Sequence, residues 1–170
     1  MFMIVIWIRS DPNGDVMGTD TAFSYFQELE ILKELDEEQS KAFLDLLVLA
    51  KFADTKVTED ELEQMDEELM RLPFLWDADV RERVVAHSAE TRTYLEEHIT
   101  DHETVTKFVK ELGARITEEA HQTVALRMFV AVTIADGITE LERNRCITFA
   151  EALGQRREDV DRLIEQLADH

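Results

Sequence analysis

The chain has 170 residues, 45% of them hydrophobic, and its 38 acidic and 18 basic residues give a formal net charge of −20. A chain of this length buries roughly 70% of its unfolded surface and needs no disulfide or metal to fold. The negative charge argues against nucleic acid and anionic membranes as direct partners, because both are recognised by basic surfaces. Five Gly and two Pro are too few for a turn-rich β protein, so an all-α fold is predicted.

Residues 1–16 form an apolar N-terminal extension that is set apart by the turn-like segment 11–15. The apolar run is too short to span a bilayer and lacks the features of a signal peptide. We favour the interpretation that Met17 is the physiological start and that residues 1–16 are not native. The alternative is a strand or flap on the domain. Residues 17–170 are expected to form a single cytoplasmic domain.

Helical segments separated by short turns follow, with Asp36 and Thr117 as expected N-caps and Pro73 and Gly154 as expected stops. A Thr-x-x-Glu capping box at Thr100 is expected to separate the fourth helix from the fifth. The predicted helices, in chain order, are 22–34, one after Asp36, 62–72, one from Asp79, 103–112, one after Thr117, 142–153 and one from Asp159.

The second half of this series repeats the first. Segments 43–54 and 125–136 are apolar at matching positions and both end on Ala-Asp, which predicts a buried central helix in each half. Segments 57–61 and 138–142 then match after a one-residue slip. We therefore predict a duplicated four-helix unit of about eight helices, with pseudo-repeats over about 21–99 and 101–169. The central helices should pack together around a pseudo-twofold axis.

The segment Ala135-Asp136-Gly137-Ile138-Thr139-Glu140-Leu141-Glu142, which 53–61 repeats more loosely, resembles the motif of the TerB-like family. This family is associated with bacterial tellurite resistance and stress. A related domain is fused to a DnaJ-like co-chaperone, where it serves association. The resemblance covers about 22–168 and implies an all-α, non-enzymatic protein with an acidic, cation-binding surface. The first turn is one residue longer than the second and lacks the glycine.

Four carboxylates are the candidate metal ligands: Asp54, Glu61, Asp136 and Glu142. In each half an Asp ends one helix and a Glu stands in the first turn of the next, so two such pairs could converge into an oxygen-rich site. Ca²⁺ or another divalent cation takes oxygen ligands of this kind. The alternative is purely structural, because Thr58/Glu61 and Thr139/Glu142 also fit capping boxes.

Other charged residues have structural interpretations beside functional ones. Asp45 and Arg127 are lone charges at equivalent positions of the central helices and are predicted either to pair with each other or to face solvent. His98 and His102 have a metal-ligand spacing, but a helix break between them argues against zinc. The acidic segment 59–68 is either a solvated face or a docking surface for a basic partner. Cys146 is expected to fill the core as a small apolar residue.

Two functional hypotheses rank above an enzyme of unrecognised type, since no catalytic motif is found in the sequence. The first is a non-enzymatic stress-response protein of the tellurite-resistance type, which binds a divalent cation and acts through protein association. The second is an acidic interaction module of the co-chaperone type with no metal role.

Overall fold

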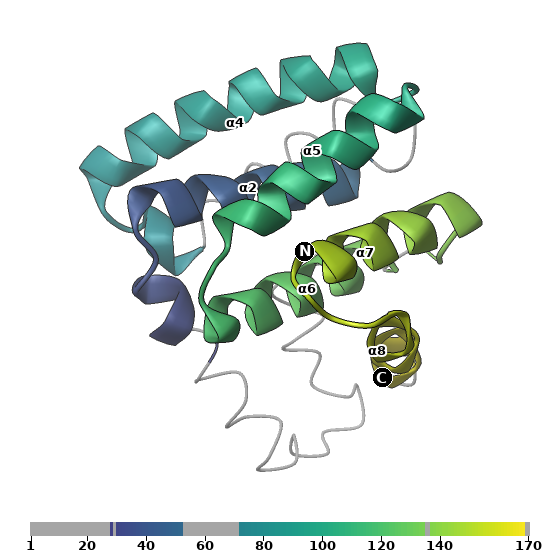
Figure 1. The fold of residues 1–170 in the computed structure, drawn as a ribbon. Helices are drawn as coiled ribbons and strands as arrows, with labels where there is room; N and C mark the ends of the chain where they lie inside the picture. Colours follow the sequence, from purple (N-terminus) through teal and green to yellow (C-terminus); the bar gives the residue numbers. More distant parts are fainter. Residues whose placement is uncertain (1–27, 29, 53–71, 135–136, 169–170) are drawn as a thin grey trace, which may run out of the picture.

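The computed structural model describes residues 28, 30–52, 72–134 and 137–168 (Figure 1). The protein is all-α across these residues, with no β-strand among them, as predicted. The described helices are α2 (Glu37–Lys51), the 3₁₀ helix η1 (Pro73–Leu75), α4 (Ala78–His98), α5 (His102–Arg115), α6 (Glu119–Thr133), α7 (Glu140–Ala152) and α8 (Arg157–Ala168). The extension 1–16 and the predicted helices over 22–34 and 62–72 lie wholly or mostly outside the described residues.

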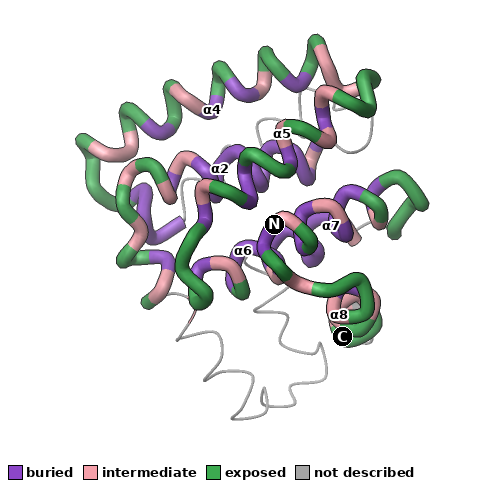
Figure 2. Tube along the Cα trace, viewed as in Figure 1, coloured by how far each residue is buried: buried purple, intermediate pink, exposed green. Residues whose placement is uncertain are grey.

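The two predicted central helices, α2 and α6, form the core of the molecule. They pack against each other, and each has ten buried residues on its 15-residue length. These buried residues are drawn in purple along α2 and α6 in Figure 2. The other helices cover this pair: α4 lies on α2, α5 lies on α2 and α7, and α8 lies on α6 and α7. The prediction that the central helices pack together is thus confirmed, and their relation by a pseudo-twofold axis stays a prediction.

The N-terminal ends of α2 and α6 lie side by side. Gln39 Nε2, in the first turn of α2, donates to Glu118 Oε1 just before α6 over 3.3 Å. From these adjacent starts the two helices run in the same general direction (Figure 1). Their C-terminal ends, which lead into the two acidic junctions, therefore lie toward the same end of the molecule.

The N-caps of α2, α4, α5, α6 and α7 are polar residues, although not always the predicted ones. Asp36 caps α2 as predicted, in a capping box with Gln39. The N-cap of α6 is Glu118 and not Thr117, so that prediction was wrong by one residue, and no side chain caps this end. Likewise α5 is capped by Asp101, whose carboxylate accepts from two backbone amides, and not by Thr100. A carboxylate in the N-cap position competes well with threonine for these amides.

The end of α7 follows the sequence prediction closely. Gly154 has φ +77°, a conformation that glycine adopts without strain. Its amide donates to Glu151 O over 3.0 Å, and the next amide, of Gln155, donates to Ala150 O over 2.8 Å. This pair of hydrogen bonds is a Schellman motif, which satisfies the last carbonyls of the helix.

Helices α5 and α7 approach closely at a glycine. A Cβ atom built on Gly113 would lie 2.5 Å from the Cβ atom of Ala152, a distance that real structures do not tolerate. The absence of a side chain at Gly113 therefore sets the distance between these helices. Gly113 is buried and lies in the last turn of α5.

None of the helices within the described ranges combines the length and the apolar composition that crossing a membrane would require.

Candidate functional site

The second acidic junction connects α6 to α7. Gly137 has φ +105°, a left-handed conformation that favours glycine. Thr139 then caps α7: Glu142 N donates to Thr139 Oγ1 over 3.2 Å, and Thr139 N donates to Glu142 Oε2 over 2.6 Å. The Thr139 hydroxyl also donates to Glu142 Oε2, over 2.7 Å. The predicted capping box at Thr139/Glu142 is confirmed, and one oxygen of Glu142 is engaged in it.

Glu142 is 9% exposed and shares the first turns of α7 with Arg145, which is 6% exposed. Arg145 Nη2 donates to Ile99 O over 3.4 Å, whereas its Nε and Nη1 atoms have no hydrogen-bond partner. Burial lowers the pKa of the Arg145 guanidinium, and the negative charge of Glu142 partly offsets this. The junction thus combines a largely buried carboxylate with a largely buried cation.

Cys146 follows in the same helix and is fully buried. Burial raises the pKa of its thiol to about 12, a shift that a hydrogen bond with Thr133 partly reduces. The thiolate is the reactive form, so this side chain is inert in the folded protein. The prediction that Cys146 is a core residue is confirmed, together with its neighbours on the same stripe, Phe149, Ala150 and Leu153.

We expect iodoacetamide to alkylate Cys146 at least about a hundredfold more slowly in the native protein than in urea at about pH 8, since reaction requires both exposure and a thiolate. Mass spectrometry of timed samples measures both rates. Equal rates would contradict the burial of this thiol.

Of the four predicted metal ligands, only Glu142 lies in the part of the chain that the structure describes. Asp54, Glu61 and Asp136 lie outside it, as does the acidic segment 59–68. Within the described ranges, no group of three or more His, Cys, Asp and Glu side chains is arranged to hold a metal ion. Convergence of the four carboxylates therefore stays a prediction.

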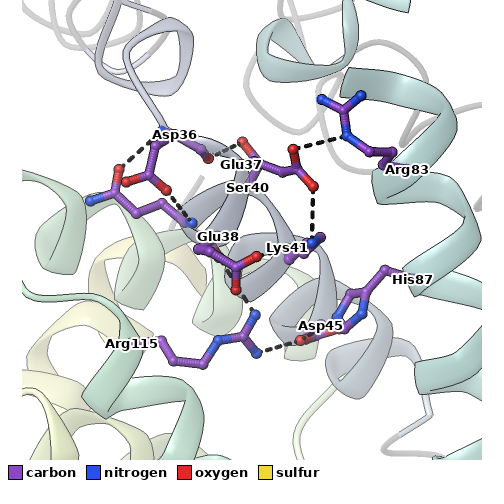
Figure 3. A network of polar contacts seen from close by, with 10 residues as sticks. Asp36, Glu37, Glu38, Ser40, Lys41, Asp45, Arg83, His87 and Arg115 are labelled. Atoms are coloured by element: carbon purple, nitrogen blue, oxygen red, sulfur yellow. Dashed lines mark hydrogen bonds and ion pairs between the residues drawn. The ribbon is translucent and has the colours of Figure 1, made fainter. Parts of the chain in front are cut away.

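A buried carboxylate at Asp45, in the middle of α2, is the centre of a polar network (Figure 3). Asp45 is 1% exposed. Arg115 Nη1 donates to its Oδ2 over 2.6 Å, and Thr91 Oγ1 donates to its Oδ1 over 2.5 Å. His87 Nε2 faces the same carboxylate, 2.8 Å from Oδ1 and 3.0 Å from Oδ2. Asp45 thereby joins α2 to α4 and to the end of α5.

These contacts overturn the prediction for Asp45 and Arg127. The two charges do not pair with each other and Asp45 does not face solvent. Arg127 Nη1 instead lies 3.3 Å from Glu28 Oε1. The lone charge at Asp45 on an apolar helix did indicate a buried polar group. Its partner could not be predicted, because the sequence contains many arginines and does not show which of them lies close to Asp45. His87, to which sequence analysis gave no role, is part of this network.

Further contacts lie around the start of α2. Glu37 accepts from Lys41 within α2, and Arg83 Nε of α4 donates to Glu37 Oε2 over 2.9 Å (Figure 3). These hydrogen bonds, first that of Lys41 and then that of Arg83, lower the pKa of Glu37. The contacts hold α4 to α2 at the molecular surface.

The predicted break between His98 and His102 is present, because α4 ends at His98 and α5 begins at His102. His98 Nδ1 lies 2.8 Å from Tyr94 O, and its ring stacks on that of Tyr94 with 4.5 Å between centroids. His98 is therefore accounted for by contacts within its own helix.

Comparison with known proteins finds no match for this chain among protein-family models, curated proteins or solved structures.

Proposed function

We propose that this protein is a non-enzymatic, TerB-like stress-response protein of the cytoplasm, which binds a divalent cation at its acidic helix junctions and acts through protein association. Asp54, Glu61, Asp136 and Glu142 are the proposed ligands. Ca²⁺ takes six to eight oxygens, so backbone carbonyls and water would complete its shell. No catalytic residue is part of this proposal.

The observation that carries the proposal is the side-by-side, same-direction packing of α2 and α6. Asp54 follows the last residue of α2 by three positions, and Asp136 follows the last residue of α6 by three positions. Because the two helices start together and run in the same general direction, their described C-terminal ends lie toward the same end of the molecule (Figure 1). This arrangement supports one shared cation site in preference to two separate ones.

A second candidate function is an acidic interaction module with no metal role. It is favoured by the hydrogen bonds of Glu142, whose Oε2 atom accepts from both the amide and the hydroxyl of Thr139. Such a capping box stabilises a helix by about 1 kcal/mol without any ion. Under this alternative the acidic junctions are helix caps.

Thermal melting distinguishes the two candidates. We expect a selective rise in Tm with one of Ca²⁺, Mg²⁺ and Mn²⁺ over chelator at fixed ionic strength. At 100-fold over the dissociation constant the gain is about 2.7 kcal/mol, which corresponds to about 5–10 °C for a chain of this size. The variant Asp54→Asn/Asp136→Asn should lose this rise.

The matched control is Glu96→Gln/Glu97→Gln, which removes two exposed carboxylates from α4. It should keep the cation-dependent rise. An equal, shallow response of all three proteins to every divalent ion would indicate charge screening alone and would favour the metal-free module.

A further inference from the structure

The guanidinium of Arg145 is a buried positive charge with an incomplete set of hydrogen bonds. Arg145 is 6% exposed, and its Nε and Nη1 atoms are buried without a hydrogen-bond partner within the described ranges. Its Nη2 atom donates to Ile99 O, at the end of α4, over 3.4 Å. Because a guanidinium keeps its proton in proteins, the charge persists although burial lowers the Arg145 pKa. A buried charge of this kind requires a counter-charge nearby.

Glu142 provides a counter-charge on the same helix. It precedes Arg145 by three positions in α7, which puts the two side chains on the same side of the helix. The negative charge of Glu142 favours the charged form of Arg145 and so opposes the effect of burial. No direct ion pair joins the two side chains within the described ranges, so the attraction acts through space.

Glu142 is also one of the proposed cation ligands. The two hydrogen bonds that it accepts from Thr139 both end on Oε2, so neither of them engages Oε1. A cation bound at Glu142 would meet the positive charge of Arg145 at close range. Burial prevents this guanidinium from turning into water, where the repulsion would be screened.

We propose that Arg145 is an internal counter-ion of the junction between α6 and α7, and that it competes with the external cation for the charge of Glu142. This inference rests on the proposed function, since it concerns the same cation site. In the cation-free protein Arg145 offsets the charge of Glu142. A divalent cation at Glu142 removes this benefit and repels Arg145, which weakens binding. The site therefore fills only at a higher cation concentration than its carboxylates alone would require.

Removing the charge of Arg145 while keeping a side chain of similar length tests the competition. Titration calorimetry with Ca²⁺, Mg²⁺ and Mn²⁺ at fixed ionic strength measures the affinities of the wild-type protein and of Arg145→Met. The ion that the wild-type protein binds should bind to Arg145→Met at least about tenfold more tightly, because one repelling charge is gone. Arg145→Lys keeps the charge and should stay within about threefold of the wild-type affinity. Arg145→Gln, which keeps a donor for Ile99 O, provides the same test if methionine prevents folding.

The matched control is Arg143→Met. It removes the same charge from the same helix, two residues away, but the Arg143 side chain is 42% exposed and donates to Asp161 of α8. Since water and salt screen a charge at the surface, the affinity should change by less than about threefold.

A double-mutant cycle in chelator tests the charge pair without any ion. Glu142→Gln removes the charge of Glu142 but keeps a residue type that fits the capping box with Thr139. Each single change leaves the other charge buried without compensation, so Glu142→Gln and Arg145→Met should be coupled by at least about fivefold in the folding equilibrium constant. Urea denaturation of the four proteins measures this coupling.

The inference is overturned if Arg145→Met binds the cation no more tightly than the wild-type protein, or if Arg143→Met tightens binding equally. It is also overturned if the cycle in chelator shows no coupling. Absence of cation binding by the wild-type protein and by every variant would overturn the proposed cation site together with this competition. Unchanged affinity of Arg145→Met beside a wild-type protein that binds would overturn the inference alone.

Discussion

Replacing Asp45 by alanine is expected to lower the free energy of unfolding by about 3 kcal/mol, the lower end of the range for breaking a buried ion pair, because Thr91 is buried whereas Arg115 and His87 keep some contact with water. Arg115, Thr91 and His87 all direct polar atoms at this carboxylate, which is 1% exposed. Each donor that loses its acceptor away from water adds a desolvation penalty. Urea denaturation, followed by circular dichroism, measures the loss.

A double-mutant cycle identifies the partner of Asp45. Asp45→Asn and Arg115→Ala should show a coupling energy of about 0.5–3 kcal/mol. The matched pair, Asp45→Asn with Arg127→Ala, should be additive within about 0.5 kcal/mol. Coupling of Asp45 to Arg127 and not to Arg115 would contradict the network in Figure 3.

Replacing Gly113 by alanine is expected to destabilise the protein by about 1–3 kcal/mol, the usual cost of overpacking a core. The added methyl group would lie 2.5 Å from Ala152 Cβ, so α5 and α7 must move apart. This cost opposes the gain of about 1 kcal/mol that alanine brings over glycine in a helix. The free energy of unfolding from urea melts reports which effect prevails.

The reciprocal exchange Gly113→Ala/Ala152→Gly is the sharper test, because it keeps one methyl group at the contact. It should recover part of the loss of Gly113→Ala, whereas Ala114→Gly, at the exposed next position of α5, reports the helix-propensity effect alone. A stabilised Gly113→Ala variant would mean that the two helices are not held in close contact there.

The fold class was predictable because it depends on local patterns. The apolar repeats over 43–54 and 125–136 identified α2 and α6, and Gly154 marked the end of α7. Boundaries were less certain where neighbouring residues compete to cap a helix, as Asp101 does with Thr100 and Glu118 with Thr117. Capping depends on the backbone angles of one residue, which the pattern of hydrophobicity does not specify.

Pairings between residues that are far apart in the chain could not be predicted from the sequence. The buried charge at Asp45 was visible as an interruption of an apolar helix, but its partner is 70 residues away. Arg127 occupies the equivalent place in the second half and contacts Glu28, 99 residues away. Asp45 also contacts Thr91 and His87, which belong to its own half of the predicted repeat. The predicted duplication therefore stays a prediction.

In the candidate cation site, too, the local pattern was predictable and the long-range arrangement was not. The capping box of Glu142 could be predicted from four residues in a row, and it is present. Convergence of two junctions requires the relative placement of α2 and α6, which the sequence supplied only as an expectation. Their adjacent N-terminal ends, joined by Gln39 and Glu118, supply the physical reason to expect one shared site.

Equilibrium dialysis against the cation that raises Tm tests this central claim most directly. One shared site predicts one bound cation per chain, and it predicts that Asp54→Asn and Asp136→Asn each abolish binding because both residues are ligands of the same ion. Two bound cations, with each substitution removing one, would contradict a shared site. Unchanged binding in both variants would contradict the assignment of these residues as ligands.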